Sequence, residues 1–321
     1  THMTDTYWIF LCGSIFIAML LDWFWGEPPA KLHPVVWMGR YLGWISKKIA
    51  PCNEEGTTGE KVKSFTLGAL FWMLGGAVVL IAASMIQSWA LGTRGLFALA
   101  VTGFSLNCLF SLKLLITEVM QVDIVLNQSL EEGRTQLKRL VSRDVSNLSD
   151  IQIRESAIES LAENLNDSFV APLFWFLLGG LPAAALYRFA NTADAMWGYK
   201  GFYGRYHWTW FGKWTARADD LLSWAPALIS TLLICLVSRC FKLKKITAEA
   251  VKTPSPNGGW PMGAMAIALD VKLSKPNVYV LNPQGQYASV FSVVQACQIA
   301  TRIFVLIILA LLMTVILDFV R

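Results

Sequence analysis

Three glutamates spaced four residues apart are the residues in this sequence with the clearest chemical potential. Glu155, Glu159 and Glu163 share one face of a helix because their spacing is i, i+4, i+8, and Asp167 continues the series if the helix persists. Like charges at this spacing repel one another mildly, so the face favours a counter-charge. Mg²⁺ bound with a nucleotide could supply this counter-charge, and so could arginine side chains. The alternative is an acidic helix face that is simply exposed to water.

A double aspartate marks a second candidate site. Asp219-Asp220 stand just before an apolar run, where an isolated charge is costly. Arg217 can neutralise the pair as a structural partner, and a divalent cation can do so as a ligand. The sequence leaves both interpretations open.

Three further strings carry polar side chains suited to ligand binding. Residues 191–200 contain Asn191, Asp194 and Lys200. Residues 255–261 place Asn257 among prolines and glycines, which fix a rigid turn and let the backbone approach a ligand closely; a simple loop is the alternative. His33 is a lone histidine near a predicted membrane interface, where a structural role is commoner than a catalytic one.

The elements that must position these residues are membrane helices. Mean hydropathy is +0.48 and only 15% of residues are charged, whereas soluble domains carry about 25%. Residues 7–25, 65–89, 95–117 and 299–320 are each apolar enough, and about long enough, to span a bilayer. Residues 168–190 are interrupted by prolines and glycines and favour a broken or re-entrant segment. They and residues 219–238 either both span or both do not.

We therefore predict an all-α polytopic membrane protein with four to six membrane segments and a cytoplasmic helical layer. It would form a single integral-membrane domain over residues 1–321, with polar cytoplasmic segments at 118–167 and 239–298. A helix capped by Asn147 or Ser149 should run through Glu163. Residues 1–3 are interpreted as an expression scar, and the first apolar run lacks the features of a cleaved signal peptide.

Charge and cysteine patterns restrict the function further. The net charge is +5, and the basic residues cluster in polar segments, which fits either the positive-inside rule or binding of anionic ligands such as phosphates. The six cysteines form no CxxC pair, so the sequence indicates neither a zinc site nor a disulfide framework. Walker A, GxSxG and HExxH motifs are absent from the sequence.

The sequence contains a series of short strings in a fixed chain order: Leu21-Asp22, Gly26-Glu27-Pro28, His33-Pro34-Val35, Gly39-Arg40, Ser142-Arg143-Asp144, Glu159-Ser160, Glu163-Asn164, Asp167, Ala171-Pro172-Leu173-Phe174, Gly179-Gly180, Pro182, Asn191-Thr192, Asp194, Met196, Gly198-Tyr199, Phe211-Gly212, Ala216-Arg217, Asp219-Asp220 and Ser255-Pro256-Asn257. In this order they resemble the adenosylcobinamide-phosphate synthase (CobD/CbiB) family of cobalamin biosynthesis over about residues 20–280. Each string is weak alone, and their order is what makes the resemblance specific.

The resemblance implies a membrane ligase that joins adenosylcobyric acid to (R)-1-aminopropan-2-yl phosphate, or a related amino-alcohol phosphate, using ATP and Mg²⁺. The corrinoid is a substrate, and the product is adenosylcobinamide phosphate. It also implies a multi-pass protein of the bacterial cytoplasmic (inner) membrane whose active site faces the cytoplasm. Its partners would be these small molecules, the lipid bilayer and other late enzymes of the pathway, with no nucleic acid.

The same resemblance carries roles onto matching residues. Glu159, Glu163 and Asp167 would be catalytic, and Glu163, Asp194, Asp219 and Asp220 would hold the metal. Substrate and phosphate binding would fall to His33, Arg143, Asn164, Asn191, Lys200, Arg217 and Asn257.

Several positions depart from the family pattern. Glu27 replaces an aspartate, and Ser223 and Leu228 stand where an asparagine and an arginine are expected; Ile267, Asp270 and Ser274-Lys275 replace small residues. These changes affect the expected amino-alcohol specificity. Two alternatives therefore stay open: a non-catalytic membrane regulator of the same superfamily, and an intramembrane metal-dependent transferase.

Overall fold

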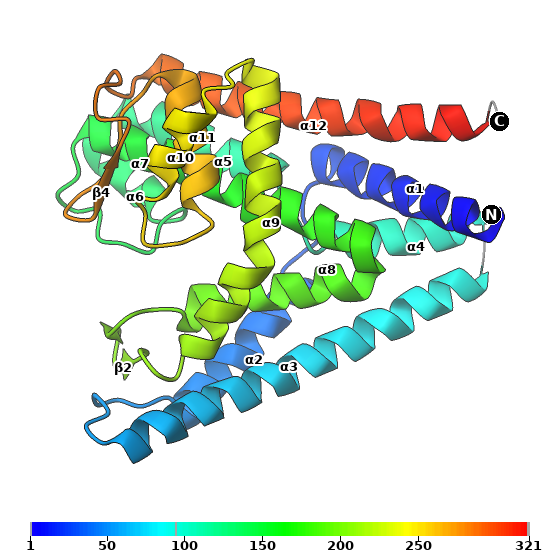
Figure 1. Ribbon diagram of the computed structural model, residues 1–321, viewed down its shortest axis with the longest axis horizontal. Coiled ribbons are helices and arrows are strands. Elements are labelled where there is room, and N and C mark those ends of the chain that lie inside the picture. Colours follow the sequence, from blue (N-terminus) through cyan, green and yellow to red (C-terminus); the bar gives the residue numbers. More distant parts are fainter. Residues whose placement is uncertain (1, 94, 320–321) are drawn as a thin grey trace. The chain divides into compact units, whose positions relative to one another are not determined.

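The computed structural model describes residues 2–93 and 95–319, and these are almost wholly helical (Figure 1). Thr1 of the predicted expression scar and Val320 of the predicted last span lie outside these ranges. The helices are α1 (His2–Phe24), α2 (Pro34–Ile49), α3 (Thr58–Thr93), α4 (Gly95–Asn107), α5 (Lys113–Leu126), α6 (Leu130–Leu137), α7 (Asp150–Leu165), the π-helical turn η1 (Asn166–Val170), α8 (Ala171–Trp197), α9 (Lys213–Ser238), α10 (Leu243–Ala250), α11 (Gly259–Leu269) and α12 (Val290–Phe319).

Two short antiparallel hairpins accompany the helices. Strands β1 (Phe202–Tyr203) and β2 (Tyr206–His207) form one, and β3 (Leu273–Lys275) and β4 (Tyr279–Leu281) form the other, with Lys275 opposite Tyr279. The sequence patterns did not indicate either hairpin. The second one matters for function, because it contributes side chains to the site described below.

The chain divides into two compact units, each built from separate stretches of sequence. The first unit comprises residues 1–110 and 171–222, and the second comprises residues 111–170 and 223–321. In the first unit α1 packs along α4, and α8 packs against both α2 and α3. In the second unit α7 packs against α5, α11, α12 and β3. The prediction of one domain over residues 1–321 stays a prediction.

Five stretches of the described chain are long and apolar enough to cross a membrane, which confirms a multi-pass membrane protein. They are Tyr7–Phe24, Thr58–Thr93, Asp150–Trp197, Lys213–Ser238 and Val290–Thr314. The third joins α7, η1 and α8, and its uncharged part runs from Ser168 to Tyr187. Both ambiguous runs of the sequence, 168–190 and 219–238, therefore belong to helices of spanning length.

The predicted continuous span over residues 95–117 is wrong. Helix α4 ends at Asn107, and a new helix, α5, begins only at Lys113. The 13 residues of α4 extend about 20 Å, which is shorter than the roughly 30 Å hydrocarbon core of a bilayer. The intervening residues 108–112 are buried, and the Ser111 N–H donates to the carbonyl of Ser168 at 2.8 Å. Hydropathy could not detect the break, because the connecting residues are themselves mostly apolar.

The predicted interruption of residues 168–190 is confirmed in α8. Gly179 and Gly180 leave helical geometry, and Gly180 has a φ of 68°, a conformation that glycine adopts without strain. The Leu181 N–H freed by this break donates to Oε1 of Gln87 on α3 at 2.7 Å. A broken helix is tolerated at membrane depth when a neighbour satisfies its backbone in this way.

Candidate active site

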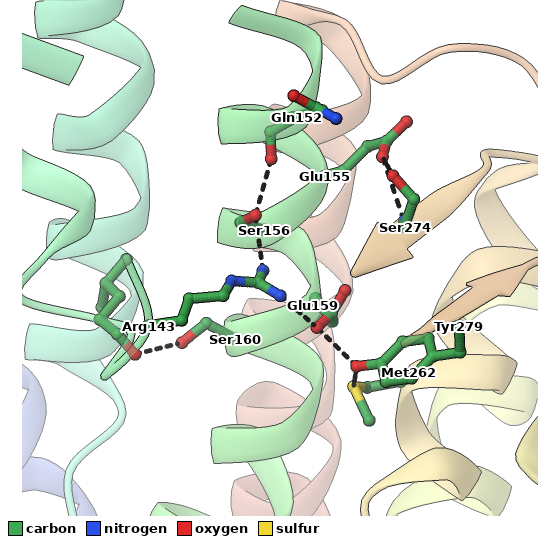
Figure 2. A network of polar contacts seen from close by, with 10 residues as sticks. Arg143, Gln152, Glu155, Ser156, Glu159, Ser160, Met262, Ser274 and Tyr279 are labelled. Atoms are coloured by element: carbon green, nitrogen blue, oxygen red, sulfur yellow. Dashed lines mark hydrogen bonds and ion pairs between the residues drawn. The ribbon is translucent and has the colours of Figure 1, made fainter. Parts of the chain in front are cut away.

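Helix α7 is the element that carries the predicted catalytic glutamates. Ser149 is its N-cap and forms a capping box with Gln152: each side chain accepts a hydrogen bond from the backbone N–H of the other residue. The predicted helix through Glu163 is therefore confirmed, with Ser149 and not Asn147 as its cap. Figure 2 shows the polar contacts along its middle turns.

Glu159 lies at the centre of these contacts and is only 6% exposed. Its Oε1 accepts a hydrogen bond from the Tyr279 hydroxyl at 2.6 Å and lies 3.7 Å from Nη1 of Arg143 (Figure 2). Its Oε2 is buried and has no hydrogen-bond partner among the described residues. Buried carboxylate oxygens are rarely left in this state, so this one is available to a ligand.

Tyr279 stays a hydrogen-bond donor across the ordinary pH range. Burial, followed by the charge of Glu159, raises the pKa of the Tyr279 phenol well above its usual value. The phenol therefore keeps its proton and directs it at Oε1 of Glu159. This contact holds Oε1 of the carboxylate in place and leaves the buried Oε2 without a partner among the described residues.

Arg143 reaches the same region from the loop between α6 and α7. Its Nη2 donates to the Ser156 hydroxyl at 2.6 Å, and that hydroxyl donates to the Gln152 carbonyl (Figure 2). Its Nε and Nη1 are buried and form no hydrogen bond among the described residues, although Nη1 faces Glu159. The guanidinium is thus held in place while two of its nitrogens keep donor capacity.

A small polar pocket of about 130 Å³ joins these groups. It is lined by two carboxylates and two cationic side chains, with serine hydroxyls and two apolar residues around them: Leu140, Val141, Ser142, Arg143, Ser156, Glu159, Ser160, Glu163 and Lys275. Three residues predicted from the sequence, Arg143, Glu159 and Glu163, therefore lie in one pocket. Lys275, at the end of β3, was not among the predicted site residues.

Glu163 lies beside the predicted loop 255–258. A Cβ atom added to Gly258 would come 3.2 Å from Oε1 of Glu163, so glycine permits the close approach. Asn257 is buried, and its Oδ1 accepts a hydrogen bond from the Ser255 hydroxyl at 2.6 Å. Its Nδ2 has no partner in the described part of the chain. The loop predicted to approach a ligand therefore lies next to the acidic helix.

Glu155 has a structural role. The N–H and the hydroxyl of Ser274 both donate to its Oε2, which ties β3 to α7 (Figure 2). Since β3 leads directly into the turn before Tyr279, this anchor also positions the phenol that contacts Glu159. Glu155 does not line the pocket.

Two other predicted residues near the end of α7 contact the helix itself. The Asn164 amide donates to the Ser160 carbonyl at 3.0 Å, and its Oδ1 accepts from Ser168. Asp167 lies in η1, where the wider turn ends the regular α-helical spacing of the glutamates, and its Oδ1 accepts from Asn166 at 2.8 Å. Neither residue lines the pocket.

The remaining predicted site residues belong to the first unit. Asn191 lies between Arg188 and Asp219: its Oδ1 accepts from Arg188 at 3.3 Å, and its Nδ2 donates to Asp219 at 3.4 Å. Arg217 and Asp220 form an ion pair at 3.6 Å, which is the structural partnership that the sequence left open. Asp194 lies in the last turn of α8.

Lys200 and His33 complete the set of predicted residues. Lys200 follows the end of α8 and is exposed. His33 is the N-cap of α2, where its Nδ1 accepts from the Val35 N–H at 3.3 Å, and its Nε2 lies 3.6 Å from Glu27. These contacts favour the structural role of His33.

The predicted metal ligands are divided between the units, with Glu163 in the second unit and Asp194, Asp219 and Asp220 in the first. Within residues 2–93 and 95–319 no three His, Cys, Asp or Glu side chains form a cluster that would hold a metal by themselves. Mg²⁺ commonly takes only one or two protein carboxylates and completes its shell with phosphates and water. The assignment of Asp219 and Asp220 of α9 as metal ligands stays a prediction.

Sequence analysis missed three residues that complete the environment of the glutamates: Ser274, Lys275 and Tyr279. Two of them were noted only as departures from the family pattern. Their one sequence signal was polarity and a basic charge next to an apolar segment, and such a signal does not say which distant helix the hairpin will contact.

Comparison with known proteins agrees with the order of the motifs. The model of the family described as CobD/Cbib protein matches residues 15–313, which is nearly the whole chain. This chain belongs to that family.

Individual relatives are similar over most of their length. The chain is 36% identical over 273 residues to the probable cobalamin biosynthesis protein CobD of Methanothermobacter thermautotrophicus, covering 83% of this chain and 85% of the relative. It is 38% identical to the probable CobD protein of Thermococcus kodakarensis, covering 82% of each. It is 32% identical to the CobD protein of Dehalococcoides mccartyi, covering 83% and 84%. No solved structure matches.

Proposed function

We propose that this CobD/CbiB protein joins adenosylcobyric acid to (R)-1-aminopropan-2-yl phosphate, or a related amino-alcohol phosphate, in a reaction that consumes ATP. The observation that carries the proposal is the pocket on α7, where Glu159 and Glu163 lie with Arg143 and Lys275. Carboxylates near a reacting amine and cations near phosphates are what this chemistry requires.

The reaction needs activation because a carboxylate is a poor electrophile at neutral pH. The γ-phosphoryl group of ATP would be transferred to the corrinoid carboxylate, giving an acyl phosphate and ADP. The amine then attacks the acyl carbon, phosphate leaves, and an amide forms. The amine loses a proton during this step, so a base within hydrogen-bond reach accelerates it.

Glu163 is our candidate for that base. It lines the pocket and lies against the glycine of the 255–258 loop. Glu159 is held by Tyr279 and Arg143, so it is suited to fixing the amine through its free Oε2. Asn257, whose Nδ2 has no partner among the described residues, would orient a substrate next to Glu163.

Mg²⁺ would be held by Asp219 and Asp220, where it would neutralise phosphate charge on the nucleotide. Asp194, Lys200, Asn191 and Arg217 of the same unit would assist in nucleotide binding, and Asp167 and Asn164 would support the end of α7. We place the polar segments in the cytoplasm, because ATP is available there, and we place the protein in the cytoplasmic membrane.

The direct test is product formation by the purified protein in lipid discs. Adenosylcobyric acid, the amino-alcohol phosphate, ATP and Mg²⁺ are supplied, and the corrinoid is followed by liquid chromatography and mass spectrometry. A species with the mass of adenosylcobinamide phosphate that depends on ATP and on Mg²⁺ supports the proposal. Intact corrinoid recovered from folded protein overturns it and favours a membrane regulator. Product without ATP dependence favours a different transferase chemistry.

A further inference from the structure

The residues that line the pocket on α7 include a buried hydrogen-bond acceptor and a buried donor that have no partner among the described residues. Oε2 of Glu159 is a buried acceptor without a partner, and Nε of Arg143 is a buried donor without one, counting only described residues. Both residues line the same pocket. Unsatisfied groups of this kind are costly in a folded protein, and a ligand that pairs with them recovers that cost.

The charges around the pocket are balanced. Glu159 and Glu163 supply negative charge, while Arg143 and Lys275 supply positive charge. A simple anion would meet two carboxylates, and a simple cation would meet two basic side chains. A ligand with an anionic end and a cationic end is therefore the class that fits, because each end can face the opposite charge.

The size of the pocket restricts the class of ligand further. Its volume is about 130 Å³. Drug-sized ligands occupy pockets of about 300 Å³ or more. The pocket cannot enclose a whole corrin ring or a whole adenine nucleotide, whereas a short alkyl chain carrying an amine and a phosphate is of the right order.

From these three observations we propose that the pocket lined by Arg143, Glu159, Glu163 and Lys275 is the subsite for the zwitterionic amino-alcohol phosphate. The amine lies at Oε2 of Glu159 and at Glu163, and the phosphate lies at Arg143 and Lys275. This assignment rests on the proposed function and goes beyond it, since it names which substrate the pocket takes and which end each residue binds.

The positions of the two cations suit a phosphate. A guanidinium binds phosphate oxygens through paired N–H donors, and that of Arg143 is oriented by its bond to Ser156. An ammonium acts as a point charge on the same group.

The experiment measures binding with three probes and needs no turnover. Isothermal titration on the protein in lipid discs, without ATP or corrinoid, compares (R)-1-aminopropan-2-yl phosphate with 1-aminopropan-2-ol and with propan-2-yl phosphate. The first probe has both charges, and each of the others lacks one. We expect each single-charge probe to bind the wild-type protein at least tenfold more weakly than the zwitterion.

Variants then assign each end of the ligand. In Lys275→Gln and Arg143→Gln the affinity for the zwitterion should fall at least tenfold, while the affinity for 1-aminopropan-2-ol stays unchanged. The ratio between these two affinities, which measures the contribution of the phosphate, should therefore fall. In Glu159→Gln the ratio between the affinities for the zwitterion and for propan-2-yl phosphate, which measures the contribution of the amine, should fall instead. Lys245→Gln, on the exposed side of α10, is the matched control and should bind all three probes like wild type. Thermal unfolding of each variant checks that it is folded.

The outcomes separate the subsite from the reaction. Zwitterion affinity that is unchanged in folded Lys275→Gln and Arg143→Gln overturns the subsite, even if the wild-type protein makes product. Charge-specific losses in a protein that makes no product uphold the subsite and overturn the proposed reaction. Equal binding of all three probes to the wild-type protein also overturns the subsite.

Discussion

The hydroxyl of Tyr279 lies 2.6 Å from Oε1 of Glu159, a residue 120 positions earlier in the chain (Figure 2). The contact leaves Oε2 of the same carboxylate buried without a partner among the described residues. A carboxylate with one oxygen held and the other unpaired is preorganised for a ligand, because binding then requires no rotation of the side chain. The β3–β4 hairpin, which is remote in sequence, thus determines how the glutamate on α7 is presented.

Removing that hydroxyl should slow turnover. In Tyr279→Phe the ring is kept and the hydrogen bond is lost, so Glu159 gains rotational freedom. We expect kcat to fall about tenfold, equivalent to about 1.4 kcal/mol, with a smaller change in the KM for the corrinoid. Steady-state kinetics of amide formation measure both constants.

The control for this change is Tyr287→Phe, at a phenol that is 66% exposed. Because the pKa of Tyr279 is raised, its phenol keeps its proton across the ordinary pH range. Any loss of wild-type activity above pH 8 therefore comes from another group and should also be seen in Tyr279→Phe. Full activity in Tyr279→Phe would contradict the positioning role.

Glu163→Gln should abolish turnover while leaving the protein folded. The amide keeps the size of the side chain but cannot accept a proton from the amine, and a general base commonly contributes 10²–10⁴-fold in rate. The product assay measures the loss, and size-exclusion chromatography confirms insertion and folding. Glu132→Gln, an exposed glutamate on α6, is the control and should behave like wild type. Normal turnover in Glu163→Gln would remove this residue from the chemistry.

Gly258, at the end of the 255–258 loop, and Gly259, the first residue of α11, should respond differently to alanine. In Gly258→Ala the new methyl group would lie 3.2 Å from Oε1 of Glu163, so the carboxylate must move slightly, and we expect turnover to fall with little loss of stability. In Gly259→Ala the methyl group would lie 2.2 Å from the Ala250 carbonyl oxygen, which is backbone and cannot yield easily. That variant should instead unfold at lower temperature. Kinetics and thermal unfolding of the pair distinguish the two effects, and equal behaviour would count against the packing of the loop on Glu163.

Gln87→Leu should destabilise the first unit through the break in α8. The Leu181 N–H would lose its acceptor, and leaving a buried backbone donor unpaired costs about 1–3 kcal/mol. Thermal unfolding in detergent measures the loss. Met85→Leu, two residues away at an exposed position on the same helix, is the control. Should both variants unfold at the wild-type temperature, Gln87 does not support the break.

The sequence by itself determined the class of the protein and the composition of its acidic helix. Low charge and long apolar runs predict membrane helices, since a bilayer sets both the length and the polarity of what crosses it. The candidate caps Asn147 and Ser149 and the four-residue spacing of the glutamates depend on local backbone geometry, and these local features correctly predicted a helix through Glu163. The glycine pair in α8 predicted its break for the same reason.

Only the tertiary structure decided which residues surround those glutamates. The turn at 108–112 escaped prediction because its residues are apolar on both sides of the break and are held by a contact with Ser168. Lys275 and Tyr279 lie more than 100 residues from Glu159, and no local pattern encodes a contact between a hairpin and a helix so far apart in the chain. Glu155, which shares the helix face with Glu159 and Glu163, became an anchor for β3 because Ser274 packs against it. The spacing placed three carboxylates on one face, and packing against the hairpin divided their roles.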